Sequence, residues 1–409
     1  MASFWLFQYN GVVRNKRLGG NHLKTIFTNA KVVTPARVIG RGGVAVENGV
    51  ILQVFEGDGD QTDAQVVDCG GNYLAPGFID THIHGAGGAD FMDARRGSLE
   101  KIVSVSADHG TTALLGTTLS STRERICAAL DCIDDCMKNP PPGAQIAGVH
   151  LEENYFSMEQ RGAQNPEYIY PPRAEEYEDY LSRADIRIVT AAPEAPGACD
   201  LARALSGREI CASIGHTCAS YEEVVAGIEA GFTHVTHAYN GMSFYSNTNY
   251  YPAMGTCESV LLRDELTLEV IADGRHVSPA MLQLLYKIKG ADRLHAVSDA
   301  VLAGMPEGDY QLGGLDTMIT DGVCMLKDRT SFAGSIATAD VLLYTLLHKA
   351  FIPLCDAVKM LTSTPARVIG LSHRKGRIAP GFDADLNVFD GDVRILATMI
   401  GGEFYKKRL

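Results

Sequence analysis

Short apolar runs alternate with longer amphipathic stretches through the middle of the chain. The first run covers residues 78–84, and seven more follow it at residues 113–119, 146–151, 186–191, 213–216, 234–238, 268–271 and 294–298. Because parallel strands are buried on both faces and are joined by crossover helices, this alternation predicts an α/β fold. Eight such strands close a (β/α)8 barrel, so we expect a TIM-like barrel.

The two ends of the chain have a different pattern, in which short β-rich runs are broken by glycine and asparagine. Residues 31–33, 43–46 and 50–55 are such runs, and Asn48-Gly49 between the last two is typical of a hairpin turn. Residues 375–389 predict a turn followed by a strand, and residues 395–401 predict one more strand. We therefore expect a small β-sandwich domain built from residues 1–74 and 375–409, beside a barrel domain of residues 75–374.

Composition disfavours several classes of protein. The chain has 409 residues, of which 46% are hydrophobic, and a formal net charge of -13 with no block of consecutive basic residues. An acidic surface repels nucleic acid and anionic membranes, so we expect neither as a partner and favour a small-molecule substrate. No apolar run approaches the roughly 18 residues of a membrane span, and no basic leader opens the sequence. Ten scattered cysteines without a Cys-x-x-Cys pair are typical of reduced thiols, so we expect a cytoplasmic protein.

Histidines and carboxylates stand at the ends of the predicted strands. Alternate residues of a strand point the same way, so His82 and His84 face one point. Four further side chains end other strands, namely Glu152, His216, His237 and Asp299. Any one of them alone is compatible with an ordinary structural role, but all six converge where the carboxyl ends of barrel strands meet. Imidazole and carboxylate suit Zn²⁺, Fe²⁺ or a similar ion, so the pattern predicts one or two divalent metals.

Several motifs contain these residues. They are residues 75–85 (APGFIDTHIHG), 150–152 (HLE), 192–194 (APE), 215–217 (GHT), 236–237 (TH), 272–276 (ADGRH), 298–300 (SDA), 333–335 (AGS) and 375–385. Together they resemble the motifs of the amidohydrolase superfamily and, within it, of the N-acetylglucosamine-6-phosphate deacetylase family, from about residue 25 onward. The resemblance implies a metal-dependent barrel with a small β-sandwich, usually a homodimer, that removes an acetyl group from an amino sugar phosphate.

The resemblance also implies roles for individual residues. Ligands of the principal metal would be Glu152, His216 and His237, and those of a second metal His82 and His84. Asp299 matches the catalytic aspartate, which would take a proton from the attacking water and return it to the leaving amine. His276 would polarise the acetyl carbonyl, or else serve as a loop hydrogen-bonder, and Asn240, Arg275 and His276 would contact substrate.

Two stretches depart from the family pattern. Glu153-Asn154 stands where members usually have Gly-Pro, and either Glu153 points to solvent or its carboxylate changes the field at the metal. Residues 238–262 contain no lysine, arginine or histidine, although family members have an arginine there that helps to bind the phosphate. The clamp is then missing or is supplied by Arg275 or Arg161. Tyrosines and asparagines of residues 243–255 would instead hold a neutral sugar, or the segment is an ordinary polar loop.

The favoured reaction is hydrolysis of N-acetylglucosamine 6-phosphate to glucosamine 6-phosphate and acetate. A different, unphosphorylated N-acetyl hexosamine is an alternative substrate, given the missing arginine. Cyclic-amide hydrolysis is a further alternative, although Glu152 occupies the strand end where other branches of the superfamily use a carboxylated lysine. A non-catalytic scaffold on the same barrel is the third hypothesis, against which the retained ligand residues speak.

Overall fold

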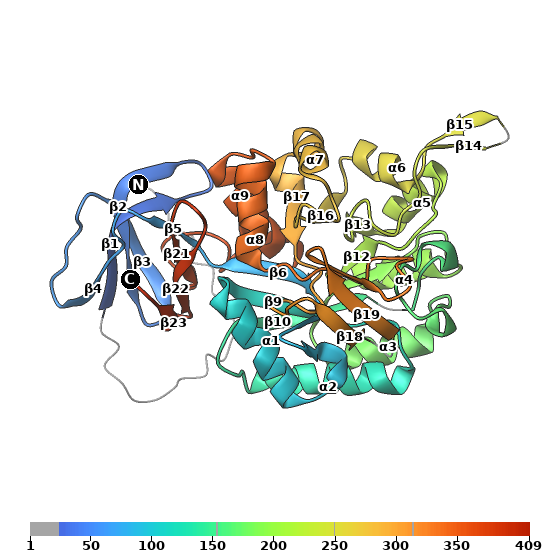
Figure 1. Ribbon diagram of the computed structural model, residues 1–409, viewed down its shortest axis with the longest axis horizontal. Coiled ribbons are helices and arrows are strands. Elements are labelled where there is room, and N and C mark those ends of the chain that lie inside the picture. Colours follow the sequence, from blue (N-terminus) through green and yellow to red (C-terminus); the bar gives the residue numbers. More distant parts are fainter. Residues whose placement is uncertain (1–23, 153, 249, 313–314) are drawn as a thin grey trace, which may run out of the picture.

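The computed structural model describes residues 24–409 except residues 153, 249 and 313–314, and its centre is a parallel barrel (Figure 1). The barrel strands, in their hydrogen-bonded order, are β6(Phe78–Ile83), β9(Thr111–Thr117), β10(Gln145–Glu152), β11(Ile186–Ala191), β12(Cys211–Ile214), β13(Phe232–Val235), β16(Thr267–Ile271) and β17(Leu294–Val297). Each overlaps one of the eight predicted runs, although β12 and β13 both begin and end earlier than the runs 213–216 and 234–238. The predicted (β/α)8 barrel is therefore confirmed.

The barrel closes between its first and last strands. Ile83 pairs with Ala300 in a parallel bridge, and the Asp299 amide donates to the His82 carbonyl over 2.8 Å. The Asp80 carboxylate adds to this seam, because it accepts from both the amide and the hydroxyl of Ser298. Closure thus places the His82 strand directly beside the segment that carries Asp299.

Helices connect and cover the strands. They are α1(Arg96–Asp108), α2(Arg123–Lys138), α3(Ala174–Arg183), α4(Ala198–Ser206), α5(Tyr221–Ala230), α6(Thr256–Leu262), α7(Pro279–Arg293), α8(Ala339–Tyr344), α9(Leu354–Met360) and α10(Ser363–Val368), with short 3-10 turns at η1(Phe91–Asp93), η2(Met158–Gln160) and η3(Pro166–Tyr168) and a π-helical turn, η4(Thr345–Lys349), after α8. Local sequence sets several of their starts. Ser220 and Glu223 form a capping box on α5, while Ser278 caps α7 just before Pro279.

Both chain ends contribute to a second sheet, at the left of Figure 1. Its strands are β1(Lys24–Val33), β2(Val38–Glu47), β3(Val50–Glu56), β4(Ala64–Asp68), β5(Tyr73–Pro76), β21(Leu386–Phe389), β22(Ile395–Ile400) and β23(Glu403–Lys407). The turn residues Asn48 and Gly49 both have positive φ, as a two-residue hairpin requires. The rings of Phe27 and Phe404 lie 5.8 Å apart although three strands separate theirs, so the sheet folds back on its own apolar core.

Three small β elements were not predicted. The strands β7(Gly85–Ala86) and β8(Ala89–Asp90) pair just after β6. A hairpin of β14(Ser246–Thr248) and β15(Tyr251–Ala253) projects from the barrel at the upper right of Figure 1. It lies within residues 243–255, for which the sequence suggested either a sugar-binding segment or an ordinary polar loop. A three-stranded sheet of β18(Gly308–Leu312), β19(Leu315–Thr320) and β20(Val323–Leu326) follows β17 and contributes a wall of the site.

The ten cysteines all lie within the described residues, and all are free, as expected. No helix within these residues combines the length and the apolar character that crossing a membrane requires.

Candidate active site and metal centre

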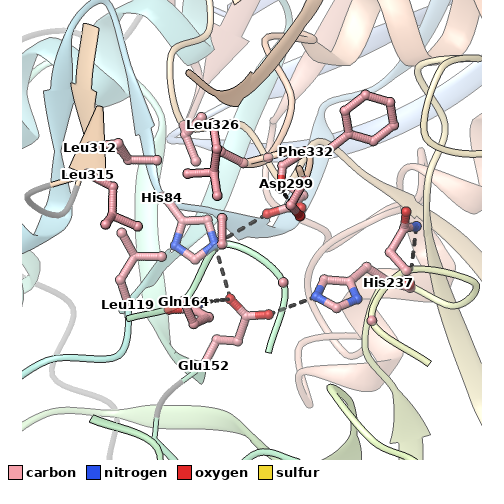
Figure 2. A pocket seen from close by; sticks show the side chains of 18 of the residues that line it. His84, Leu119, Glu152, Gln164, His237, Asp299, Leu312, Leu315, Leu326 and Phe332 are labelled. Atoms are coloured by element: carbon pink, nitrogen blue, oxygen red, sulfur yellow. Dashed lines mark hydrogen bonds and ion pairs between the residues drawn. The ribbon is translucent and has the colours of Figure 1, made fainter. Parts of the chain in front are cut away.

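The five predicted ligand residues and Asp299 meet at the carboxyl end of the barrel, and Figure 2 shows His84, Glu152, His237 and Asp299 facing one another. Glu152, the last residue of β10, lies at the centre. Its Oε1 is 3.1 Å from His216 Nε2 and 2.8 Å from His237 Nε2, and these two nitrogens are 3.1 Å apart. Three donor atoms from the ends of β10, β12 and β13 therefore face one point, which is the arrangement that a bound ion needs.

The second carboxylate oxygen of Glu152 faces the histidine pair of β6. Its Oε2 is 3.2 Å from His84 Nε2 and 3.4 Å from His82 Nε2. Asp299 Oδ1 completes this group at 3.2 Å from His84 Nε2 and 3.5 Å from His82 Nε2. The donor atoms thus form two triads with Glu152 between them, and this geometry fits two ions that share one carboxylate as well as it fits one.

The surrounding histidines keep both carboxylates ionised despite their burial. Burial raises the pKa of the Glu152 carboxyl, but the neighbouring histidines, His82 foremost, outweigh it and hold that pKa well below its usual range. Burial also raises the pKa of the Asp299 carboxyl, but the charges of His82 and His84 and the hydrogen bond from His84 outweigh burial and lower that pKa overall. Two buried anions surrounded by imidazole nitrogens form a chemically appropriate site for divalent cations.

Three of the residues predicted for the metal site have left-handed backbone conformations. The φ angles are 48° at His216, 27° at His237 and 47° at Asp299, values that side-chain-bearing residues rarely adopt. Each residue lies two positions after the last residue of its strand, so the turn out of the barrel aims its side chain inward. Gly241 permits this crowding, because a Cβ there would lie 2.8 Å from His216 Nδ1, and its own φ is 57°.

His276 borders the pocket beside the two donor triads. Its Nδ1 lies 2.7 Å from Asp273 Oδ2, and its amide donates to the other oxygen of the same carboxylate. Its Nε2 is buried without a hydrogen-bond partner in the described structure, and its ring packs against Phe332. The Asp273 carboxylate thus fixes the orientation of the ring and leaves Nε2 available to a polar group in the pocket.

Of the other residues predicted to contact substrate, Asn240 lines the pocket, whereas Arg275 and Arg161 do not. Asn240 lines the pocket, and its side-chain amide donates to the His237 carbonyl over 3.3 Å. Arg275 is exposed and lies near Gly322, at the turn between β19 and β20, outside the pocket lining. The Arg161 guanidinium donates to the Met158 carbonyl and is likewise outside the described lining. Sequence order placed Arg275 beside His276, but only His276 faces the pocket.

One wall of the pocket is apolar (Figure 2). Leu119 follows β9, and the three-stranded sheet adds further side chains, so that the wall comprises Leu119, Leu312, Leu315, Leu326 and Phe332. Among the described residues, no lysine or arginine lines the pocket. The tyrosines of the projecting hairpin do not line it either, and Tyr250 is fully exposed. The suggestion that this segment holds a neutral sugar therefore has no support within the described part of one chain.

Of the two residues that stand in place of the usual Gly-Pro, the structure describes only Asn154. Glu153 lies outside the described residues. Asn154 is fully buried, and its side chain exchanges hydrogen bonds with the backbone of Ser121 at 3.2 Å. Asn154 thus ties the segment after β10 to the segment after β9, which is a structural role.

Sequence reasoning missed several polar residues of this region. Glu269 on β16 contacts two of the ligand residues, Asp273 orients His276, and the Gln164 amide reaches Glu152 Oε2 at 3.4 Å. Glu269 is the one charged residue in the run 268–271, and this was a signal in the sequence, because a buried charge needs a partner. Gln164 had no such signal, since it lies in a loop.

The chain is similar to known amidohydrolases over most of its length. A model of the amidohydrolase family matches residues 73–405. N-acetylglucosamine-6-phosphate deacetylase of Vibrio furnissii is 34% identical over 359 residues, covering 87% of this chain and 88% of that protein. N-acetylgalactosamine-6-phosphate deacetylase of Escherichia coli O157:H7 is 31% identical over 333 residues, covering 81% of this chain and 87% of that protein.

A solved structure agrees over the whole fold. A variant of N-acetyl-D-glucosamine-6-phosphate deacetylase from Mycobacterium smegmatis, in complex with N-acetyl-D-glucosamine-6-phosphate, has a TM-score of 0.86 and 28% identity, covering 95% of this chain and 100% of that chain. Sequence, fold and site geometry agree with the resemblance that the motifs indicated. The chain belongs to the amidohydrolase family and, within it, to the N-acetylglucosamine-6-phosphate deacetylases.

Proposed function

We propose that this chain hydrolyses the N-acetyl amide of an amino sugar, and that N-acetylglucosamine 6-phosphate is converted to glucosamine 6-phosphate and acetate. Water adds to the acetyl carbonyl, the carbon–nitrogen bond breaks, and the proton from water ends on the amine. The observation that carries the proposal is the position of the Asp299 carboxylate between a metal-type triad and the pocket that His276 borders. The names of the relatives supply the substrate.

Each side chain has a part in this reaction. Glu152, His216 and His237 would hold one ion, and His82 and His84 a second. A bound divalent ion lowers the pKa of water and polarises a carbonyl, which makes hydrolysis feasible near neutral pH.

Proton transfer falls to Asp299, because an ionised carboxylate at the pocket can take a proton from water and return it to the leaving nitrogen. His276 Nε2 would donate to the carbonyl oxygen as charge develops there. Asn240 would contact the sugar from the pocket lining.

Several finer assignments belong to the same proposal. We infer that the native ion is zinc or iron, because imidazole and carboxylate donors suit both. We also infer a cytoplasmic homodimer. Residues 1–74 and 375–409 are proposed as one domain and residues 75–374 as the other, a division supported by an apolar cluster that is drawn only from the two chain ends.

Acetate release tests the proposal. Metal-replete protein would be incubated with N-acetylglucosamine 6-phosphate, and acetate and free amine would be measured together. Equal amounts of both products, lost on chelation and restored by Zn²⁺ or Fe²⁺, are expected. Turnover of a hydantoin or dihydropyrimidine without acetate release from any amino sugar would replace the proposal with cyclic-amide hydrolysis.

A further inference from the structure

We propose that Glu269 is a positioning residue that orients His82 and the backbone of His237 for metal binding. Glu269 lies in the middle of β16, and its relative exposure is 0%. It lines no part of the pocket among the described residues, so it acts through the histidines and does not touch substrate. The inference rests on the metal centre of the proposed function and adds a residue outside the predicted ligand set.

The first contact fixes His82. Glu269 Oε1 lies 2.6 Å from His82 Nδ1, so that nitrogen carries the proton and donates. The other ring nitrogen, Nε2, faces Glu152 and Asp299, and in the neutral imidazole that metal binding requires it is the nitrogen without a proton. A carboxylate behind a metal-binding histidine selects its tautomer, fixes its ring orientation and raises the basicity of the binding nitrogen.

The second contact fixes the turn that carries His237. The His237 amide donates to the same oxygen of Glu269 over 3.0 Å, and the Ala238 amide donates to the Glu269 carbonyl over 2.8 Å. His237 has a φ of 27°, a conformation that persists only when its surroundings hold it. One glutamate therefore touches a residue of each donor triad, and its removal affects both.

The surroundings of Glu269 favour this role over a separate metal site. Its Oε2 is 3.6 Å from His234 Nε2 and 3.9 Å from His295 Nε2. These two rings stack with an interplanar angle of 9°. Their in-plane lone pairs therefore lie in nearly parallel planes, a geometry less suited to one shared ion than that of the two donor triads. Burying a carboxylate is costly, and an apolar side chain would fill the same space in β16 at lower cost. The charge is therefore retained for its contacts with His82 and His237.

The test compares Glu269→Gln with wild type in metal binding, which does not depend on turnover. The amide has the same shape but no charge, so it keeps an acceptor for the His237 amide and weakens the support of His82. Apo-protein would be titrated with Co²⁺ and followed by visible absorption, with bound metal measured by elemental analysis after dialysis. We expect the affinity for one ion to fall about 10- to 100-fold while the melting temperature of the apo-protein stays unchanged.

A matched control is Glu176→Gln, because Glu176 is also a buried glutamate but bonds to Tyr155 and Tyr170, away from the donor triads. This control should bind Co²⁺ as wild type does. Glu269→Asp is a second variant that keeps the charge but withdraws it from His82, and it should also lose affinity. Wild-type Co²⁺ affinity in both Glu269 variants would overturn the inference. Absence of acetate release with reduced Co²⁺ affinity would instead refute the proposed function alone.

Discussion

Replacing Asp299 with asparagine should separate proton transfer from metal binding. Only two carboxylates, Glu152 and Asp299, line the described pocket, and Glu152 is enclosed by the histidines. No other carboxylate of the described lining can therefore take the proton. General acid–base catalysis contributes about 10²- to 10⁴-fold, so the substitution should raise the barrier by roughly 3 to 5 kcal/mol.

The assay measures kcat for acetate release together with metal content. The ion held by Glu152, His216 and His237 should remain, because Asp299 is not in that triad. Asp200→Asn serves as a control, since the Asp200 side chain is exposed on α4. If the Asp299 variant kept its metal and lost less than about tenfold in kcat, the assignment of Asp299 as proton carrier would be refuted.

Three further predictions concern the metal, the buried ion pair and the substrate. His216→Ala removes one donor of the Glu152 triad and should lower the metal content by one ion per chain in elemental analysis; unchanged content would contradict this ligand set. Lys375→Met leaves the buried Asp385 without its partner and should lower the free energy of unfolding in urea by about 3–5 kcal/mol. Burial lowers the pKa of Lys375, but Asp385 and Asp383 outweigh burial and raise that pKa overall. The wild-type protein should therefore keep this stability up to the ordinary lysine pKa of about 10.4 and lose it only at higher pH. The Lys375→Met variant should show no such loss. One charged hydrogen bond to a phosphate contributes about 1.5–3 kcal/mol, which is roughly tenfold or more in kcat/KM. Because no lysine or arginine lines the described pocket, N-acetylglucosamine and its 6-phosphate should differ by less than roughly tenfold. A larger preference for the phosphate would place a phosphate-binding group outside that lining.

Local patterns determined the framework of the molecule. The eight apolar runs predicted the eight barrel strands because burial on both faces of a parallel strand favours apolar residues at most positions. The hairpin at Asn48-Gly49 followed from backbone preference alone. The barrel also explains why His82, Glu152 and His216 meet, since every parallel strand brings its carboxyl end to the same rim.

Tertiary structure alone decided which neighbouring residues face the site. Arg275 and His276 are adjacent in sequence, yet the Asp273 carboxylate turns His276 to the pocket, whereas Arg275 lies exposed near Gly322. The apolar wall comes largely from the sheet after β17, whose strands had no predicted place in the fold.

Long-range packing likewise decided the partner of His82. Glu269 lies 187 positions away along the chain, and a single charged residue in an apolar run indicates a need for a partner without identifying it. The sequence by itself therefore determined strand positions and the donor types at the rim, because periodicity and strand polarity act locally. The pairing of Glu269 with His82 and His237 was decided only when closure of the barrel brought β16 beside β13 and within reach of β6.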